Sequence, residues 1–329
     1  MKIKIVLLTV LCTFGLFAFQ SCYKPKPPVI GLLMDEFSTE RWVKDTTIFI
    51  KSVNDLGGKV ICLVANRDPA KQLEQAKFLI KKKVKVLVIL PVDLKKAAQI
   101  VKEAQAAHIP VISYDRLILN ATPDYYISFD NIKVGEMQAN YILNRLGKGN
   151  IALIGGPKSD YNSSFLRVGQ LGIFQPFIEK GDIKIVFDQQ ATTWSDTAGY
   201  RLAKDCLKEN NNKIDAFIAG NDVLARGIIQ ALEEKKLDGK VLVTGQDGDS
   251  KACENIMNGK QTMTVYKPIE EIADVAASTA ISLAKGEPVK ATMTTNNGTK
   301  LIPSILISPL IVNKGNIEMQ INPKRLAQE

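Results

Sequence analysis

The residues best suited to chemistry in this chain are its two tryptophans and a set of arginines and aspartates that follow apolar runs. The tryptophans, Trp42 and Trp194, each carry an indole ring whose flat, polarisable face can stack on another ring. A guanidinium donates hydrogen bonds in a fixed plane and can bridge two neighbouring hydroxyls, while a carboxylate accepts from them. These residue types favour non-covalent recognition of a hydroxyl-rich ring.

Most of the polar candidates stand directly after short apolar runs that we expect to be buried parallel strands. Ligands of open α/β sheets bind outside the carboxyl ends of the strands, so these residues should converge in space. The runs cover 29–34, 111–113, 151–154, 214–219, 241–244 and 262–266. The residues after them are Asp35, Asp115 with Arg116, Asp160 with Asn162, Asn221 with Asp222, Asp247 and Lys267. The alternatives are that the tryptophans pack in the core and that an isolated Arg or Asp lies on the surface.

The elements that must position these residues alternate between strand and helix. Strands separated by amphipathic helices require parallel sheets with right-handed crossovers. One sheet of about ten strands would be unusual, and the strand at 125–130 leads into a new round of alternation, so we predict two lobes with a first passage near Asp130. Hinged lobes commonly capture small ligands. The predicted helices cover 39–56, 70–82, 94–107, 133–146, 165–179, 196–208, 223–234 and 269–284, and 302–309 is an extended tail.

The first residues predict export and a lipid anchor. Lysines precede the apolar stretch 5–19, which ends in Ser21-Cys22. A small residue before a cysteine at this place resembles the lipobox of bacterial lipoproteins, which implies that Cys22 is acylated. We therefore predict a signal peptide at 1–21 and a polar, proline-rich tether at 22–28. The alternative is a transmembrane anchor, although the stretch is shorter than the ~20 residues that a span needs.

Several function classes lose support from the sequence. His108 is the single histidine, which removes the usual general base and every His-based metal triad. The Gly155-Gly156-Pro157 turn lacks the spacing of a nucleotide-binding loop, and neither a P-loop nor a G-x-S-x-G motif occurs. We therefore predict a protein without cofactor or metal and without catalytic activity, although carboxylate pairs leave glycoside hydrolysis open.

Charge and cysteines add two further expectations. The formal net charge is +9, but the lysines are spread over helix faces, with a run only at 81–83 that closes a helix, so we predict no nucleic-acid partner. Cys62, Cys206 and Cys253 lack metal or redox spacing. We expect them to be small core residues, the alternative being a disulfide and one reactive thiol.

Longer blocks of sequence resemble a known family. These blocks are 40–45, 114–116, 126–131, 210–215, 245–247 and 261–268. In this order they resemble the type I periplasmic sugar-binding proteins, and within them the D-xylose-binding proteins of ABC importers, over about residues 29 to 317. The resemblance implies two Rossmann-like lobes joined by a three-segment hinge, with an N-terminal lobe of 29–129 and 267–298 and a C-terminal lobe of 130–266 and 299–329.

The resemblance also assigns the sugar-binding residues. It implies Arg41, Trp42, Asp115 and Arg116 in the first lobe, Asp160, Asn162, Trp194, Asn221 and Asp247 in the second, and Lys267 beside the hinge, with Arg167 matched to a sugar-binding arginine of the ribose binders. The chain departs from the family between Pro157 and Asn162, where it is one residue longer and has Tyr161 in place of a small polar residue.

These observations predict a monomeric, lipid-anchored receptor of the cell envelope that closes around a monosaccharide, D-xylose first, and hands it to the permease of an ABC transporter. Three alternatives remain open: another pentose or hexose such as ribose, a sugar-sensing input to a membrane histidine kinase, and an enzyme acting on sugars. A transcription repressor with these lobes would need a helix-turn-helix where the export signal stands.

Overall fold

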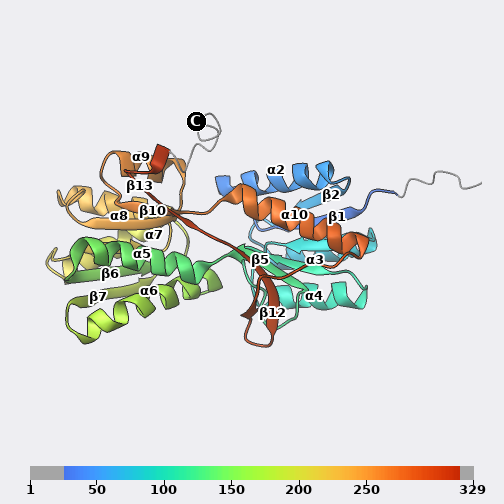
Figure 1. The fold of residues 1–329 in the computed structure, drawn as a ribbon, viewed down its shortest axis with the longest axis horizontal. Helices are drawn as coiled ribbons and strands as arrows, with labels where there is room; N and C mark the ends of the chain where they lie inside the picture. Colours follow the sequence, from blue (N-terminus) through green and yellow to red (C-terminus); the bar gives the residue numbers. More distant parts are fainter. Residues whose placement is uncertain (1–25, 319–329) are drawn as a thin grey trace, which may run out of the picture.

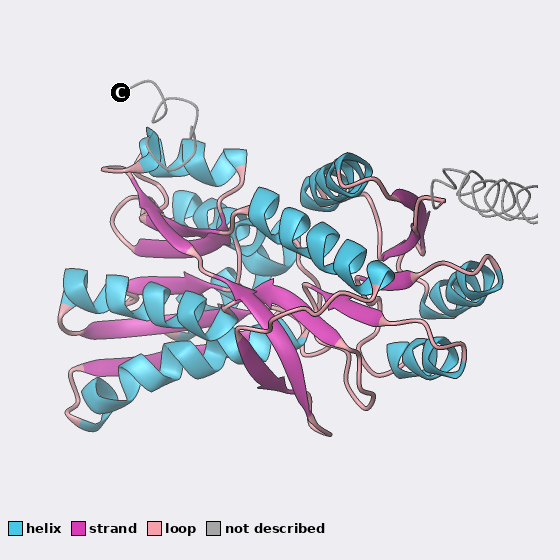
Figure 2. Ribbon diagram, turned by 45° about the vertical axis from the view of Figure 1, so that its right-hand side comes forward, coloured by secondary structure: helices cyan, strands magenta, loops and turns pink. Residues whose placement is uncertain are grey.

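The computed structural model describes residues 26–318. The predicted signal peptide (1–21), the predicted lipidation site Cys22 and most of the tether lie outside the described residues. The predicted α/β fold is confirmed: Figure 1 shows two lobes side by side, and Figure 2 shows that helices flank the strands of each. None of the helices within 26–318 combines the length and the apolar character needed to cross a bilayer.

The first lobe is built on a seven-stranded sheet in the order β11-β12-β5-β4-β3-β1-β2, parallel except for the pairing of β11 with β12. One core joins the sheet to α2 and α10 through Phe49 and Ile272, and a second joins the other face to α3 and α4 through Leu79 and Val101. The elements are β1 (Val29–Met34), α2 (Glu40–Asp55), β2 (Lys59–Val64), α3 (Pro69–Lys81), β3 (Val86–Ile89), α4 (Ala97–Ala106), β4 (Val111–Tyr114), β5 (Tyr125–Phe129), α10 (Ile269–Lys285), β11 (Met293–Asn296) and β12 (Leu301–Ile307).

The second lobe is built on a six-stranded sheet in the order β13-β10-β9-β8-β6-β7, parallel except for the pairing of β13 with β10. Helices α7 and α8 cover one face, with Leu207 and Ile228 in the core, and α5 and α6 cover the other, with Ile142 and Phe174. The elements are α5 (Asn131–Leu146), β6 (Gly149–Gly155), α6 (Tyr161–Glu179), β7 (Ile183–Gln190), α7 (Asp196–Glu209), β8 (Ala216–Ala219), α8 (Asp222–Glu234), β9 (Leu242–Asp247), α9 (Ser250–Met257), β10 (Met263–Tyr266) and β13 (Leu310–Asn313).

Local sequence explains where these elements begin. The central strands are continuous apolar runs because parallel strands are covered on both faces. The side chain of Asp68 accepts hydrogen bonds from the first backbone N–H groups of α3, and Pro69 occupies the first helical position, where its missing N–H costs nothing. Helix α9 is absent from the predicted helices, although Asp249 caps it in the same way.

The chain changes lobe between β5 and α5, between β10 and α10, and between β12 and β13 (Figure 1). The prediction that residues 299–307 belong to the second lobe is wrong, because β12 pairs in parallel with β5 of the first sheet, Ser304 opposite Tyr126. Strand β12 thereby covers an edge that β5 would otherwise expose. The third passage therefore follows Ile307 rather than residue 298.

Candidate functional site

The carboxyl ends of the strands of both lobes face one another, and the structure connects most of the predicted site residues through direct contacts. Asp35 follows β1, and Asp115 and Arg116 follow β4. Asp160 and Asn162 follow β6 at the start of α6. Contacts within or between the lobes join Asp35, Arg41, Trp42, Asp115, Arg116, Asp160, Asn162, Trp194, Asp247 and Lys267.

Arg41 of the first lobe lies near three carboxylates, those of Asp45, Asp115 and Asp247. It donates to Asp115, and its Nε lies 3.5 Å from Asp45 Oδ2, one helical turn further along α2. Asp45 in turn accepts a hydrogen bond from the buried Tyr114. Burial raises the pKa of Asp45 to about 6, against the opposing effect of Arg41. Asp45 is absent from the predicted site residues, although its i, i+4 spacing from Arg41 is a signal for it.

Asp115 adopts a backbone conformation that L-residues rarely adopt. Its φ is 59°, in the left-handed region, directly after β4. Its carbonyl oxygen accepts hydrogen bonds from the Ser128 hydroxyl at 2.7 Å and the Tyr126 hydroxyl at 3.1 Å, which hold the turn. Burial would raise the pKa of its carboxyl, but Arg41, Lys267 and Arg116 together hold that pKa below its usual value. The turn therefore presents an ionised acceptor between the lobes.

Arg116 connects the two lobes. Its Nη1 donates to Asp35 Oδ2 at 2.7 Å within the first lobe, and its Nε lies 3.4 Å from Asp160 Oδ2 of the second. The guanidinium carbon is 5.5 Å from the centroid of the Trp42 ring, and that of Arg41 is 4.4 Å from the same centroid. Trp42 is 7 % exposed and packs in the first-lobe core, so its ring supports both guanidinium groups.

Trp194 is linked to the same contacts through Asp160. Its Nε1 donates to Asp160 Oδ2 at 3.2 Å, the oxygen that also faces Arg116. The indole ring lies against two strand ends that carry glycine: a Cβ on Gly156 would come within 2.0 Å of the ring, and one on Gly220 within 3.1 Å. From the sequence, Gly156 is predicted only to be part of a tight turn. Its missing side chain is what leaves room for the indole.

Asn162 joins the second lobe to the backbone of the first. Its Nδ2 lies 3.3 Å from both the carbonyl oxygen and the Oδ1 of Asp115, and its Oδ1 accepts from Asn131 Nδ2 at 3.0 Å. The Tyr126 hydroxyl lies 3.4 Å from the same Oδ1. Tyr126 and Asn131 were not among the predicted site residues, because nothing in their local sequence separates them from ordinary strand and helix positions.

Asp247 completes the charged group from the second lobe. Its Oδ1 lies 3.9 Å from Arg41 Nη1 and 3.8 Å from Lys267 Nζ, and its φ of 101° is again in the left-handed region. Buried Asp222 holds the turn that follows, accepting from the backbone N–H groups of Gly248 at 2.8 Å and Asp249 at 3.2 Å. Asp222 is predicted from the sequence to follow a strand, and the prediction gives it no role.

Lys267 is 2 % exposed at the second passage between the lobes. Its Nζ is 5.4 Å from the Phe129 ring centroid at the end of β5. Burial lowers its pKa, while Asp247 and Asp115 oppose that shift. A buried ammonium beside two carboxylates is a donor that can reach a ligand on the hinge side.

Two predicted residues of the described chain share no hydrogen bond, ion pair or cation–π contact with this group. Asn221 is 8 % exposed, and its Oδ1 caps α8 by accepting from Leu224 N at 2.9 Å. Arg167 pairs with Asp188 at 2.9 Å beside the end of β6, and its Nη1 is buried with no hydrogen-bond partner in the described part of the chain. Their assignment to the ligand site stays a prediction.

The group contains buried polar atoms that make no hydrogen bond within residues 26–318. They include the Nε atoms of Arg41 and Arg116, Oδ1 of Asp35 and Oε1 of Gln246. The two Nε atoms still face the carboxylates of Asp45 and Asp160 at 3.5 and 3.4 Å, so they are ion-paired although they make no hydrogen bond. A buried polar atom without a partner costs about 1–3 kcal/mol, so Asp35 Oδ1 and Gln246 Oε1 stand ready to accept from a polar ligand.

Metal and thiol chemistry find no support in the described residues. Among those residues, the structure shows no group of three or more His, Cys, Asp or Glu side chains that could hold a metal ion. Cys62, Cys206 and Cys253 are free, and burial raises the pKa of the Cys206 thiol to about 12. They are therefore not joined in a disulfide.

Comparison with known proteins agrees with this architecture. The sequence of residues 30–288 matches the family model described as periplasmic binding protein domain. The chain is 43 % identical to the D-xylose-binding periplasmic protein of Escherichia coli over 97 % of its length and 96 % of that protein. It is also 43 % identical to the protein of the same name from Haemophilus influenzae, over 96 % and 95 % of the two chains.

A solved structure shares both the fold and part of the sequence. A carbohydrate transporter solute-binding protein from Chloroflexus aurantiacus, in complex with D-glucose, superposes with a TM-score of 0.83 and 30 % identity, covering 91 % of this chain and 96 % of that one. The predicted family resemblance is therefore confirmed by sequence and by fold. The chain belongs to the periplasmic binding protein family.

Proposed function

We propose that this protein is a non-catalytic receptor that captures D-xylose between its two lobes and delivers it to an ABC importer. The observation that carries the proposal is the meeting of Arg41, Asp115 and Arg116 of the first lobe with Asp160 and Asp247 of the second at the strand ends. We infer D-xylose as the sugar because both relatives that are 43 % identical to this chain are named D-xylose-binding periplasmic proteins.

The proposed recognition rests on matching hydroxyls to fixed donors and acceptors. A sugar loses strong hydration when it is buried, so each hydroxyl needs a partner. The planar donors of Arg41 and Arg116 and the acceptors of Asp35 and Asp115 are held by their own neighbours before the sugar arrives. An epimer would leave some of these groups unpaired, which costs affinity.

The proposed transport step uses closure of the lobes. The sugar would touch both lobes only when they approach, so binding would favour the closed arrangement. In our proposal the permease of an ABC transporter reads that closure, and the protein acts as a monomer. We further propose that Cys22 carries a lipid that holds the receptor in the periplasm at a membrane surface, with 22–28 as the tether.

Isothermal titration calorimetry of the purified mature chain tests the ligand. D-Xylose, ribose, arabinose, glucose and galactose are titrated in turn, and each sample is then analysed for chemical change of the sugar. We expect the tightest binding for D-xylose and recovery of the sugar unchanged. A response to ribose or galactose without a response to D-xylose would overturn the ligand, and turnover of the sugar would overturn the non-catalytic role.

A matched pair of arginine variants tests the site. Arg116→Lys keeps the charge but loses the planar group whose Nη1 donates to Asp35 and the Pro91 carbonyl while its Nε faces Asp160. Arg145→Lys makes the same change at an exposed position of α5, where Arg145 donates to the Tyr141 hydroxyl. We expect Arg116→Lys to weaken D-xylose binding by more than about tenfold, or about 1.4 kcal/mol, and Arg145→Lys to leave it unchanged. Equal affinities of the two variants would contradict the assignment of Arg116.

A further inference from the structure

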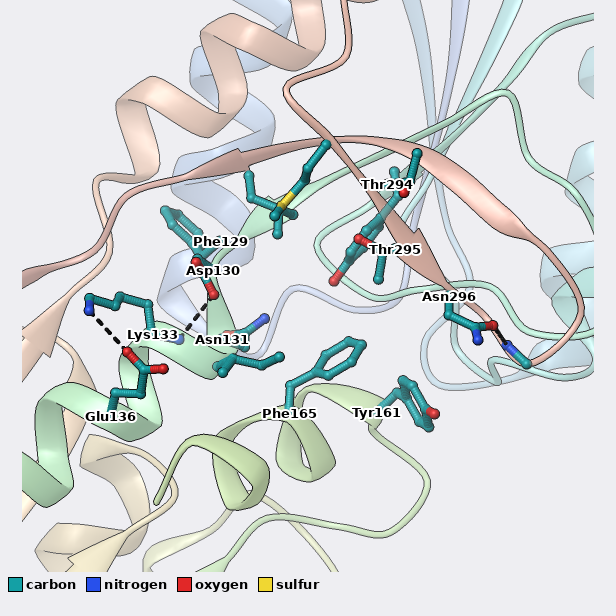
Figure 3. A pocket seen from close by; sticks show the side chains of 15 residues that line it. Phe129, Asp130, Asn131, Lys133, Glu136, Tyr161, Phe165, Thr294, Thr295 and Asn296 are labelled. Carbon is teal, nitrogen blue, oxygen red and sulfur yellow. Dashed lines mark hydrogen bonds and ion pairs between the residues drawn. The ribbon is translucent and has the colours of Figure 1, made fainter. Parts of the chain in front are cut away.

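A second pocket, of about 460 Å³, lies beside the hinge between the β11–β12 hairpin and the first turns of α5 and α6 (Figure 3). Its walls come from both lobes, with Phe129, Met293 and Leu306 from the first and Tyr161 and Phe165 from the second. The volume lies within the range of small-molecule sites. None of the charged residues proposed to bind the sugar lines this pocket.

The walls of this hinge-side pocket favour a ring. Tyr161 and Phe165 stand edge to face on α6, with ring centroids 4.9 Å apart and an interplanar angle of 76°. Figure 3 shows the Phe165 ring pointing from α6 toward the hairpin. Met293 is 47 % exposed, so part of the apolar wall is open to solvent.

The polar lining selects against anions. Lys133 and Glu136 pair with each other at 2.9 Å, so their charges cancel. Asp130 is the remaining charged residue of the lining, and its carboxylate accepts from the backbone N–H of Lys133 at 3.0 Å. A carboxylate or phosphate ligand would meet this negative charge without a free cation among the lining residues.

Asn131 supplies a hydrogen-bond acceptor. This residue lines the pocket and is 3 % exposed, and its Oδ1 is buried without a hydrogen-bond donor among the described residues. Such an atom needs a donor, which a hydroxyl group provides. Its Nδ2 donates to Asn162 Oδ1, and Asn162 Nδ2 in turn reaches Asp115. Asn131 therefore stands between the pocket and the proposed sugar site.

We propose that the hinge-side pocket binds a small uncharged phenol or aryl alcohol, and that its occupancy strengthens sugar binding. The ring would lie against Tyr161 and Phe165, and the hydroxyl would donate to Asn131 Oδ1 once entry of the ligand uncovers that buried atom. Because both lobes form the walls, such a ligand makes all its contacts only when the lobes are together, which favours the closed arrangement. The binding step stands alone, whereas the coupling rests on the proposed sugar-binding function.

Fluorine NMR of 3-fluorobenzyl alcohol with the mature chain tests the binding step. We expect saturable line broadening with a dissociation constant on the order of 1 mM, as suits a ligand of this size. The control probe is 3-fluorobenzoate, which has the same ring but carries a negative charge. Non-saturable broadening, or equal binding of the two probes, would overturn the proposal.

Variants on α6 and β11 locate the probe. Phe165→Ala removes a wall of the pocket, and Val168→Ala makes a comparable truncation on the same helix at a side chain that is 58 % exposed and outside the lining. Thr295→Trp fills the pocket from the hairpin without truncating its apolar wall. We expect Phe165→Ala and Thr295→Trp to weaken probe binding at least fivefold and Val168→Ala to leave it unchanged. Wild-type binding by folded Thr295→Trp would overturn the location.

Calorimetry tests the coupling. We expect the D-xylose dissociation constant to fall about fivefold when benzyl alcohol saturates the pocket, and to stay constant in Thr295→Trp. An unchanged constant in the wild type would overturn the coupling while leaving the fluorine result valid. If the chain bound no sugar at all, the fluorine measurement would still decide the binding step, so failure of the two proposals can be told apart.

Discussion

The close fit between Gly156 and the Trp194 indole gives a sharp test of the proposed site. In Gly156→Ala the new Cβ would lie 2.0 Å from Cη2 and 2.2 Å from Cζ2 of the indole. Carbon atoms in contact keep a separation of about 3.5 Å, so the ring edge must move by about 1.5 Å. Gly156 itself need not touch the sugar for this substitution to affect binding.

The expected cost follows from what the indole holds. A shift of this size breaks the 3.2 Å hydrogen bond from Trp194 to Asp160, worth about 1 kcal/mol, and misplaces a face proposed to stack on the sugar, worth about another 1 kcal/mol. The sum of about 2 kcal/mol corresponds to about 30-fold weaker binding of D-xylose.

Calorimetry on Gly156→Ala, with Gly172→Ala as the matched control, measures this effect. A Cβ on Gly172 meets nothing within 4 Å, and this residue lies on α6, so its replacement should leave affinity unchanged and stabilise the helix by up to about 1 kcal/mol. Thermal melts verify that both variants are folded. Binding by folded Gly156→Ala within twofold of the wild type would refute the reasoning that the indole position sets affinity.

Three further predictions concern other parts of the chain. Burial raises the pKa of Asp45 to about 6, so the folded state binds this proton more tightly than the unfolded state does. The unfolding free energy of the wild type relative to Asp45→Asn should therefore fall as the pH rises from about 4 to 6, by about 1.4 kcal/mol per pKa unit. Urea melts that show no such trend would contradict this prediction. Asp222 accepts from Gly248 and Asp249 through Oδ2 and from Gln261 through Oδ1, so Asp222→Asn, which replaces one acceptor oxygen with an NH₂ donor, should cost about 1–3 kcal/mol in the same melts, with exposed Asp205→Asn as the neutral control. Cys22→Ala should release the protein from the membrane fraction of the cell envelope, and retention there would reject the lipid anchor.

Much of the fold could be predicted because its signals are local. Apolar runs separated by stretches with helical period indicate parallel strands covered on both faces. The predicted helix at 70–82 corresponds to α3, whose start is marked by Asp68 and Pro69. Polar residues at strand ends were visible for the same reason, and Asp35, Asp115, Arg116 and Asp160 all take part in the contacts between and within the lobes.

The errors arose where a residue's environment depends on distant segments. The stretch 301–307 looks extended in sequence, but nothing in it states that its partner is β5, more than 170 residues earlier. The sequence around Tyr126 and Asn131 likewise contains no motif that indicates a function, and Asp45 is indicated only by its spacing from Arg41. Their importance comes from Arg41, Asp115 and Asn162, which only folding brings near them.

The alternation of strands and helices, the polar chemistry at the strand ends and the family could all be predicted from the amino-acid sequence. The folded chain was needed to show that β12 belongs to the first sheet, that Gly156 makes room for Trp194, and that Asp222 holds the turn after Asp247. The physical reason is one of range. Hydrophobic periodicity and helix capping act over a few residues and are written locally, whereas strand partners, steric fit and buried hydrogen bonds join residues that are far apart along the chain.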